Sequence, residues 1–189
     1  MMKTGIAGGI GSGKSYVCQL LRKRGYEVYD CDDAAKRLIR TSPEIREQLT
    51  LLVGPQAYTS DGQLNKAVIS QFLLASADNQ KAINDIVHPA VFRDFEESKM
   101  EWMESAIMYE SGIYKLVDRV VVVTAPLETR IRRVMRRDHI SRKKVLEWIE
   151  KQLPQEEVVR RADFELINDG KADLEQQLNK IIEQCNRPF

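Results

Sequence analysis

The strongest constraint on this chain is the stretch Gly8 to Ser15, GGIGSGKS, which satisfies the pattern G-x-x-x-x-G-K-[ST] in full. It follows a short apolar run, Lys3 to Ala7, and precedes apolar residues at helical spacing. Between a strand and a helix, this pattern predicts a loop whose backbone N–H groups bind phosphate oxygens. Its glycines allow the winding, and the helix N-terminus adds a partial positive charge. The sequence therefore predicts a phosphate site rather than a glycine-rich turn without a ligand.

Each part of this loop has an expected task. Lys14 should reach the β- and γ-phosphates, and the Ser15 hydroxyl is placed to bind Mg²⁺. The residues expected to hold the nucleotide are Gly8, Gly9, Gly11, Ser12, Gly13, Lys14, Ser15 and Tyr16.

Strands and helices alternate along the chain. The predicted strands are residues 3–7, 26–30, 105–110, 119–126 and 164–168, and the run RVVVVT is typical of a strand buried on both faces of a parallel sheet. Residues 42–103 show little strand signal and apolar positions at helical spacing. The pattern predicts an α/β layered domain with a helical insertion between its second and third strands.

Composition argues against several classes of function. Lys and Arg number 29 against 28 Asp and Glu, so there is no basic field to attract nucleic acid. Two histidines and no HExxH motif argue against a zinc enzyme, and three distant cysteines without a CxxC motif indicate reduced thiols. The longest aliphatic run, Val120 to Val123, is too short to span a bilayer. We expect a soluble cytoplasmic protein that binds neither nucleic acid nor membrane.

Among P-loop proteins, the chain fits a small-molecule kinase best. It lacks the NKxD guanine reader of GTPases, and its strongest strand ends in VTAP without the carboxylate typical of motor ATPases. Asp30 and Asp32 lie at the end of the second predicted strand, where open α/β sheets place their ligands. One of them could accept or orient the proton of an acceptor hydroxyl, although both could simply cap the next helix.

The helix predicted from residue 127 is rich in arginine. Arg130, Arg133 and Arg137 fall on one face, at spacings of three and four. A face of arginines without acidic partners favours a phosphate clamp that closes over the nucleotide, although a solvated face is the alternative.

With these motifs in order, the chain resembles the dephospho-CoA kinase family over essentially its whole length. The opening is GIAGGIGSGKSY, followed by Asp30-Cys31-Asp32, by DGQLNK at 61–66, by His88-Pro89, by AIMYE at 106–110, by the lid motif at 133–138 and by ADFELINDG at 162–170. The P-loop alone would be unspecific, but the ordered series is much more specific.

The resemblance implies ATP- and Mg²⁺-dependent phosphorylation of the ribose 3′-hydroxyl of dephospho-CoA, the last step of coenzyme A synthesis. It implies a P-loop nucleotide kinase fold: three layers, a central parallel sheet of about five strands, a helical acceptor-binding insertion and a helical lid. The single domain would divide into a nucleotide-binding core (1–41, 104–130 and 162–189), an acceptor subdomain (42–103) and a lid (131–161).

The same resemblance assigns residues to roles. The catalytic residues would be Asp32, preferred over Asp30, with Lys14 and Arg137. Arg133, Arg137, Asn168 and Gly170 would join the P-loop in binding ATP, while Asp32, His88, Tyr109 and Glu110 would bind the acceptor. His88 before a proline is as consistent with a structural hydrogen bond as with acceptor contact.

The chain also departs from the family pattern. Ala7 stands where the family has a threonine, Tyr16 follows the Lys-Ser pair, and Ala106 replaces a proline. Two alternatives stay open: a P-loop kinase of another nucleoside, nucleotide or small metabolite, and an ATP-binding regulator that transfers no phosphate.

Overall fold

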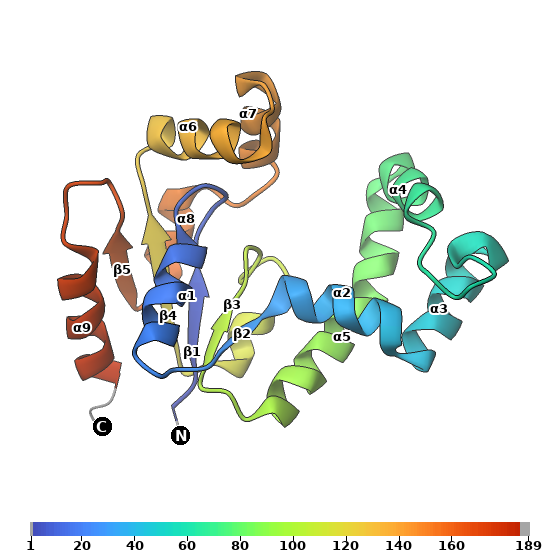
Figure 1. Cartoon of the computed structure of the whole chain (residues 1–189), viewed down its shortest axis with the longest axis horizontal. Coiled ribbons are helices and arrows are strands. Elements are labelled where there is room, and N and C mark those ends of the chain that lie inside the picture. The colour runs from blue at the N-terminus through green and yellow to red at the C-terminus, as the bar shows by residue number, and fades with distance from the viewer. Residues whose placement is uncertain (1, 186–189) are drawn as a thin grey trace. The chain divides into compact units, whose positions relative to one another are not determined.

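The computed structural model describes residues 2–185, and these form two compact units. The first contains the described residues up to Asp30 and from Lys99 onward, and the second is Cys31–Ser98. The first unit holds the whole sheet, and the second is helical (Figure 1).

The sheet of the first unit has five parallel strands in the order β2-β3-β1-β4-β5. They are β1 (Thr4–Ala7), β2 (Val28–Asp30), β3 (Trp102–Glu104), β4 (Arg119–Thr124) and β5 (Phe164–Ile167). In the register of the central strands, Ile6 pairs with Glu104 on one side and with Val121 on the other. All strands run the same way, so the P-loop after β1 lies at the edge of the sheet where β2, β3, β4 and β5 also end.

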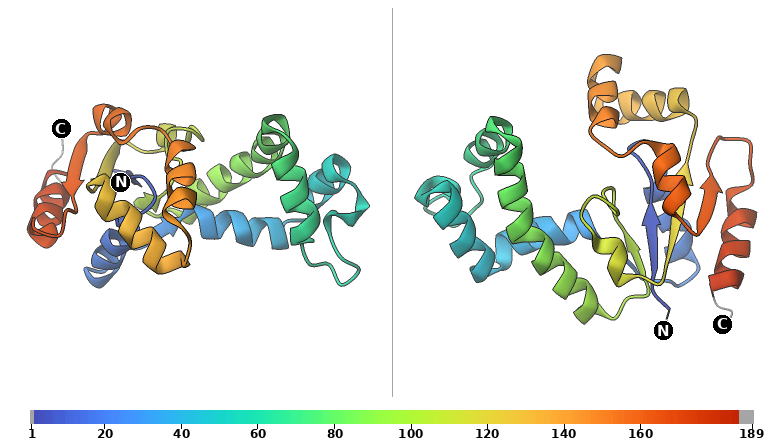
Figure 2. Two further views of the ribbon diagram at one scale, coloured as in Figure 1. Left: turned by 90° about the horizontal axis from the view of Figure 1, so that it is seen from above. Right: turned by 180° about the vertical axis from the view of Figure 1, so that it is seen from behind.

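Helices cover both faces of this sheet (Figure 2). On one face, α1 (Lys14–Lys23) and α9 (Leu174–Cys185) pack against the strands, and Ile6, Val121 and Leu166 join residues of both helices in one buried cluster. The opposite face carries α8 (Gln155–Arg161), the short helix η2 (Ile113–Leu116) and Met108, which lies against Gly5. The predicted three-layer α/β fold with five parallel strands is confirmed.

Two helices of the first unit, α6 (Leu127–Asp138) and α7 (Arg142–Glu150), follow β4. They have a small core of their own, formed by Ile131, Val134 and Val145, and Ile10 of the P-loop packs against it. Ser141 caps α7 by accepting a hydrogen bond from the N–H of Lys144. The two helices are therefore joined to the P-loop by apolar packing.

The second unit consists of α2 (Cys31–Thr41), α3 (Pro43–Val53), η1 (Pro55–Ala57), α4 (Lys66–Ala75) and α5 (Ala77–Ser98). Ser42 caps α3, and Asn65 caps α4. Buried residues of α3 and α5, such as Leu49 and Phe95, form the interior of this unit. No helix in the described part of the chain is both long and apolar enough to cross a membrane.

The third strand was predicted at the wrong place. Residues 106–110 form turns, and the strand is the three residues Trp102–Glu104, which end just before Ser105. Ser105 ends it, because its hydroxyl accepts a hydrogen bond from the N–H of Ile107 at 3.3 Å and so turns the chain. The short apolar run after Ser105 resembled a strand, but it is held by these turns.

Candidate active site

The loop between β1 and α1 has the geometry of a phosphate cradle. Lys14 opens α1 and is only 8% exposed. Its Nζ donates a hydrogen bond of 2.8 Å to the backbone oxygen of Gly8 and lies 3.6 Å from Glu104 Oε1. The lysine side chain therefore folds back toward the start of the loop, and its ammonium group contacts both Gly8 and Glu104.

Two glycines of the loop make room for side chains that arrive from elsewhere in the fold. Gly13 has a φ of +105°, and a Cβ there would overlap the amide nitrogen of Asn168. A Cβ on Gly9 would overlap the guanidinium group of Arg130. The glycines of the motif therefore serve both the curvature of the loop and the close approach of its supporting residues.

The Ser12 hydroxyl indicates that this loop is built for a ligand. Ser12 is fully buried, and its Oγ has no hydrogen-bond partner among the described residues. A buried polar atom without a partner is costly, and a phosphate oxygen would supply one. Ser15 and Tyr16 lie in the first turn of α1 with exposed side chains, where the helix N-terminus favours an anion.

Arg133 and Asn168 support the loop from its outer side. Arg133 Nη1 donates to the backbone oxygen of Ser12 at 3.1 Å, and its Nη2 donates to Asn168 Oδ1, also at 3.1 Å. Asn168 is 6% exposed, and its Nδ2 donates to the same Ser12 oxygen at 2.8 Å. Both ends of the Asn168 amide are thus engaged within the protein, while Gly170 lies in the turn just after it with a φ of +84°.

The other two arginines of this helix face differ from each other. Arg130 is 5% exposed, and its Nε donates to the backbone oxygen of Ile10 at 3.0 Å. Arg137 is exposed and pairs with Asp138 through two hydrogen bonds of 2.8 Å. The expectation of a face without acidic partners is therefore wrong at Arg137. Asp138 is the last residue of α6 and directly follows Arg137.

Glu104 is a residue of the site that the sequence reasoning missed. It ends β3, it is 9% exposed, and its carboxylate faces the ammonium group of Lys14. The strand that it closes has only three residues, WME, and so short a run is a weak strand signal beside the valines of β4. A carboxylate closing Trp102–Glu104 was the signal that could have found it.

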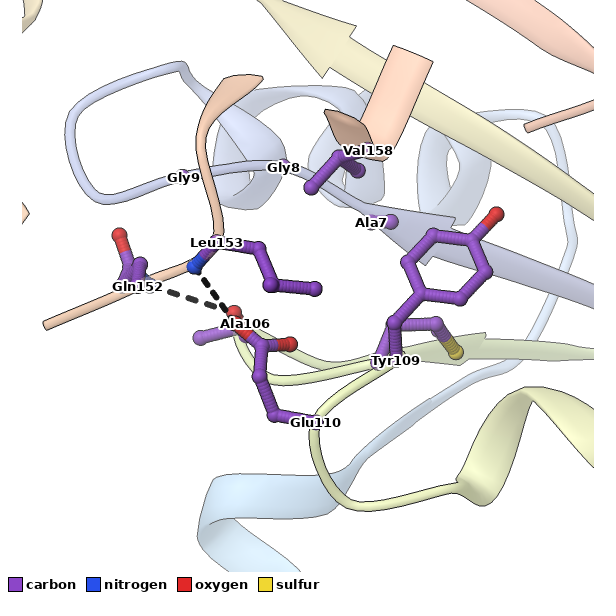
Figure 3. A pocket seen from close by; sticks show the side chains of 10 residues that line it. Ala7, Gly8, Gly9, Ala106, Tyr109, Glu110, Gln152, Leu153 and Val158 are labelled. Atoms are coloured by element: carbon purple, nitrogen blue, oxygen red, sulfur yellow. Dashed lines mark hydrogen bonds between the residues drawn. The ribbon is translucent and has the colours of Figure 1, made fainter. Parts of the chain in front are cut away.

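Tyr109 and Glu110, expected to bind the acceptor, line a small pocket beside Gly8 and Gly9 (Figure 3). Its volume is about 10 Å³, which is room for about one water molecule. The Tyr109 hydroxyl is buried without a hydrogen-bond partner in the described part of the chain, and burial raises the pKa of Tyr109 to about 12. Glu110 Oε1 accepts a hydrogen bond of 3.1 Å from the N–H of Leu153. At this volume the pocket has no room for a group larger than a water molecule.

Asp32 and His88 belong to the second unit. Asp32 is exposed in the first turn of α2, which begins directly after β2 ends at Asp30. His88 lies inside α5 before Pro89, half-buried and stacked on Phe92 with ring centroids 6.2 Å apart. Burial lowers the pKa of His88. Within its own unit, the His88 ring therefore packs against Phe92, and this contact does not depend on a ligand.

The residues present also fit a magnesium ion carried by a nucleotide. Within the described residues, no three His, Cys, Asp or Glu side chains form a group that could hold a metal. Mg²⁺ bound to a nucleotide keeps several waters and takes few protein ligands besides phosphate oxygens. The exposed Ser15 hydroxyl at the mouth of the loop matches that limited requirement.

Comparisons with known proteins agree with this geometry. The family model described as dephospho-CoA kinase matches residues 2–174. The dephospho-CoA kinase of Bacteroides fragilis (strain YCH46) is 42% identical over 188 residues, covering 96% of this chain and 91% of that protein. A crystal structure from Thermus thermophilus superposes with a TM-score of 0.85 at 34% identity and covers 99% of this chain and 98% of that one.

A third relative bears on the fold alone. The dephospho-CoA kinase from Campylobacter jejuni has a TM-score of 0.67 at 19% identity, with 96% of each chain covered. The family match spans nearly the whole chain and includes the P-loop, the arginines of α6 and Asn168. This chain belongs to the dephospho-CoA kinase family and is an ATP-dependent kinase of coenzyme A synthesis.

Proposed function

We propose that the site transfers the γ-phosphoryl group of ATP to the ribose 3′-hydroxyl of dephospho-CoA. The bond between the acceptor oxygen and the γ-phosphorus forms, while the bond from that phosphorus to the β,γ-bridging oxygen breaks. The products are coenzyme A and ADP, and the hydroxyl proton leaves to a carboxylate. The observation that carries the proposal is the P-loop with its buried, unpartnered Ser12 hydroxyl and the Lys14 ammonium folded over it.

Lys14 stabilises the charge that moves during transfer. Its ammonium group is held by Gly8 and Glu104 and lies where the β- and γ-phosphates would reach the loop. The loop amides and the Ser12 hydroxyl would bind phosphate oxygens in place. Because these donors are fixed before ATP arrives, little reorganisation is needed during the reaction.

Arginines of α6 would neutralise the transferring group. Arg130 is the better placed, because its guanidinium group is buried against Gly9. Arg133 holds the backbone of Ser12 and acts on the loop itself. Arg137 would need to leave Asp138 before it could reach a phosphate, so we assign it to a lid movement of residues 131–161.

The second unit would supply the acceptor side. We assign Asp32 as the carboxylate that orients the 3′-hydroxyl or takes its proton, since it is exposed at the start of α2. The helical insertion, with His88 in α5, would bind the acceptor. Tyr109 and Glu110 would contact the pantetheine arm once their pocket opens.

Two further assignments complete the nucleotide site. The Ser15 hydroxyl would hold Mg²⁺, which when bound neutralises charge on the phosphates. Asn168 would act by supporting the loop, and the backbone around Gly170 would contact adenine.

We also place the reaction in the cytoplasm, where the reduced state of three buried cysteines is maintained.

The test is a coupled assay of ADP release with Mg-ATP and dephospho-CoA, run beside AMP, adenosine and no acceptor. We expect ADP release that depends on dephospho-CoA, with the product identified as coenzyme A by mass and by its 3′-phosphate. Turnover on AMP or adenosine alone would favour a kinase of another acceptor. ATP binding without turnover on any acceptor would favour a nucleotide-binding regulator.

A further inference from the structure

Ile10, at the tip of the P-loop, is held from three directions by residues of the 127–153 segment. Its N–H donates a hydrogen bond of 2.8 Å to Gln152 Oε1. Its backbone oxygen accepts one of 3.0 Å from Arg130 Nε. Its side chain packs against the apolar cluster of α6 and α7. Both sides of one P-loop residue's backbone are therefore bound by side chains more than a hundred positions away.

Gln152 also reaches a second loop. While its Oε1 accepts from Ile10, its Nε2 donates to the backbone oxygen of Ala106 at 3.2 Å (Figure 3). Ala106 lies just beyond β3, in the loop that carries Tyr109 and Glu110. A single amide thus joins the loop expected to hold phosphate to the loop expected to face the acceptor.

The next residue strengthens the same attachment. The N–H of Leu153 donates to Glu110 Oε1 at 3.1 Å, so the turn between α7 and α8 binds the loop after β3 at two points. This turn lies between the C-terminal end of α7 and Pro154, which caps α8. Gln152 and Leu153 are half-buried. Through these two hydrogen bonds, the end of the segment 127–153 is attached to the loop that follows β3.

We propose that Gln152 is a positioning residue for phosphoryl transfer. It fixes the Ile10 peptide and the Ala106 loop relative to each other, and this role rests on the proposed function. In-line transfer needs the donor phosphate and the acceptor oxygen aligned at close range, and a displacement of about 1 Å can cost about 100-fold in rate. Gln152 need not touch either substrate to contribute that alignment.

The chemistry of the contact requires a neutral amide. One end of the group accepts a hydrogen bond and the other end donates one. A carboxylate of the same shape can still accept from Ile10, but it places a second oxygen against the Ala106 oxygen. Gln152→Glu therefore keeps the size of the side chain and breaks one half of the bridge, whereas Gln152→Ala removes both halves.

The experiment compares Gln152→Ala and Gln152→Glu with wild type in the dephospho-CoA assay. The matched control is Gln155→Ala, three positions on, whose side chain accepts a hydrogen bond from the N–H of Ala125 at 3.3 Å and, among the described residues, forms none with the P-loop. We measure kcat, the KM for each substrate, ATP binding by calorimetry, and Tm. We expect kcat to fall by about 10- to 100-fold in Gln152→Ala, with the ATP dissociation constant within about threefold of wild type.

Two substitutions at Gln152 keep the test informative if one of the variants fails to fold. We expect at least a tenfold fall in kcat for Gln152→Glu, a Tm close to that of wild type, and kcat within twofold of wild type for Gln155→Ala. A folded Gln152→Glu variant with kcat within twofold of wild type would overturn the role, as would an equal fall in the Gln155→Ala control. If the wild-type protein shows no turnover on dephospho-CoA, the proposed function itself is overturned. The wild-type arm of the same assay therefore tests the proposed function separately from the role of Gln152.

Discussion

The side-chain amide of Asn168 donates to the backbone oxygen of Ser12 at 2.8 Å, and so ties the end of β5 to the P-loop after β1. We expect Asn168→Ala to weaken ATP binding by about 5- to 30-fold, because a buried backbone oxygen and Arg133 each lose a partner, at a cost of about 1–2 kcal/mol. Calorimetry with ATP measures the effect. Asn179→Ala is the control, since Asn179 is exposed on α9 and accepts from Arg24; equal losses in both variants would contradict the assignment.

Gly13 should tolerate no side chain. We expect Gly13→Ala to abolish ATP binding and to lower the free energy of unfolding by more than about 2 kcal/mol, because the left-handed φ and the overlap with Asn168 act together. Gly25→Ala is the matched control. Its φ is +87°, but a Cβ there meets no atom within 4 Å, so it pays backbone strain alone. Urea unfolding of both variants separates strain from collision, and similar losses would refute the collision.

Arg130 should matter more to catalysis than its neighbours on α6. Arg130→Ala removes a buried charge beside Gly9 and leaves the Ile10 oxygen without its donor. We expect kcat to fall by about 100- to 1,000-fold, the usual loss when one preorganised donor is removed. Arg132→Ala, at an exposed position of the same helix, should retain near-normal kcat. Steady-state kinetics that placed the two variants together would argue against the phosphate role.

Asp32→Asn tests the acceptor side. The substitution keeps the shape of the side chain but removes its basicity, so we expect turnover to fall by about two orders of magnitude with ATP binding retained. Asp33→Asn is the control, because Asp33 lies in the same turn and its carboxylate binds Lys36 at 3.0 Å. Single-turnover measurements at saturating substrates would show the difference. Normal turnover in Asp32→Asn would remove it from catalysis.

The lowered pKa of His88 predicts how the stability of the fold depends on pH. Burial lowers the pKa of folded His88, with a smaller opposing effect from Asp85. Below about pH 6.5, the unfolded chain therefore binds a proton that the folded chain does not bind, so His88 makes stability fall as pH drops. We expect His88→Gln to flatten the decline of Tm between pH 7 and pH 5. A variant whose Tm declines as steeply as that of wild type would show that other groups control this range.

The features predicted best from sequence are those set by local residues. The eight-residue motif from Gly8 to Ser15 specifies its own strand–loop–helix context, and the run of valines in β4 identifies a strand buried on both faces. None of these inferences requires knowledge of distant parts of the chain.

The features missed depend on distant contacts. Helical spacing placed Arg130, Arg133 and Arg137 on one face, but it could not show that Arg130 is buried on the P-loop while Arg137 binds Asp138. Glu104 belongs to the site because its carboxylate faces Lys14, which lies 90 residues earlier in the chain. A three-residue strand such as β3 carries too little pattern to outweigh the apolar run that follows it.

The buried cysteines have a consequence for an enzyme whose substrate and product each end in a free thiol. Cys18, Cys31 and Cys185 are all buried, and burial raises the pKa of Cys18 to about 12. Mixed disulfides form through exposed thiolates, and a buried protonated sulfur is a poor partner for that exchange. Burial therefore disfavours the formation of mixed disulfides between these cysteines and oxidised coenzyme A.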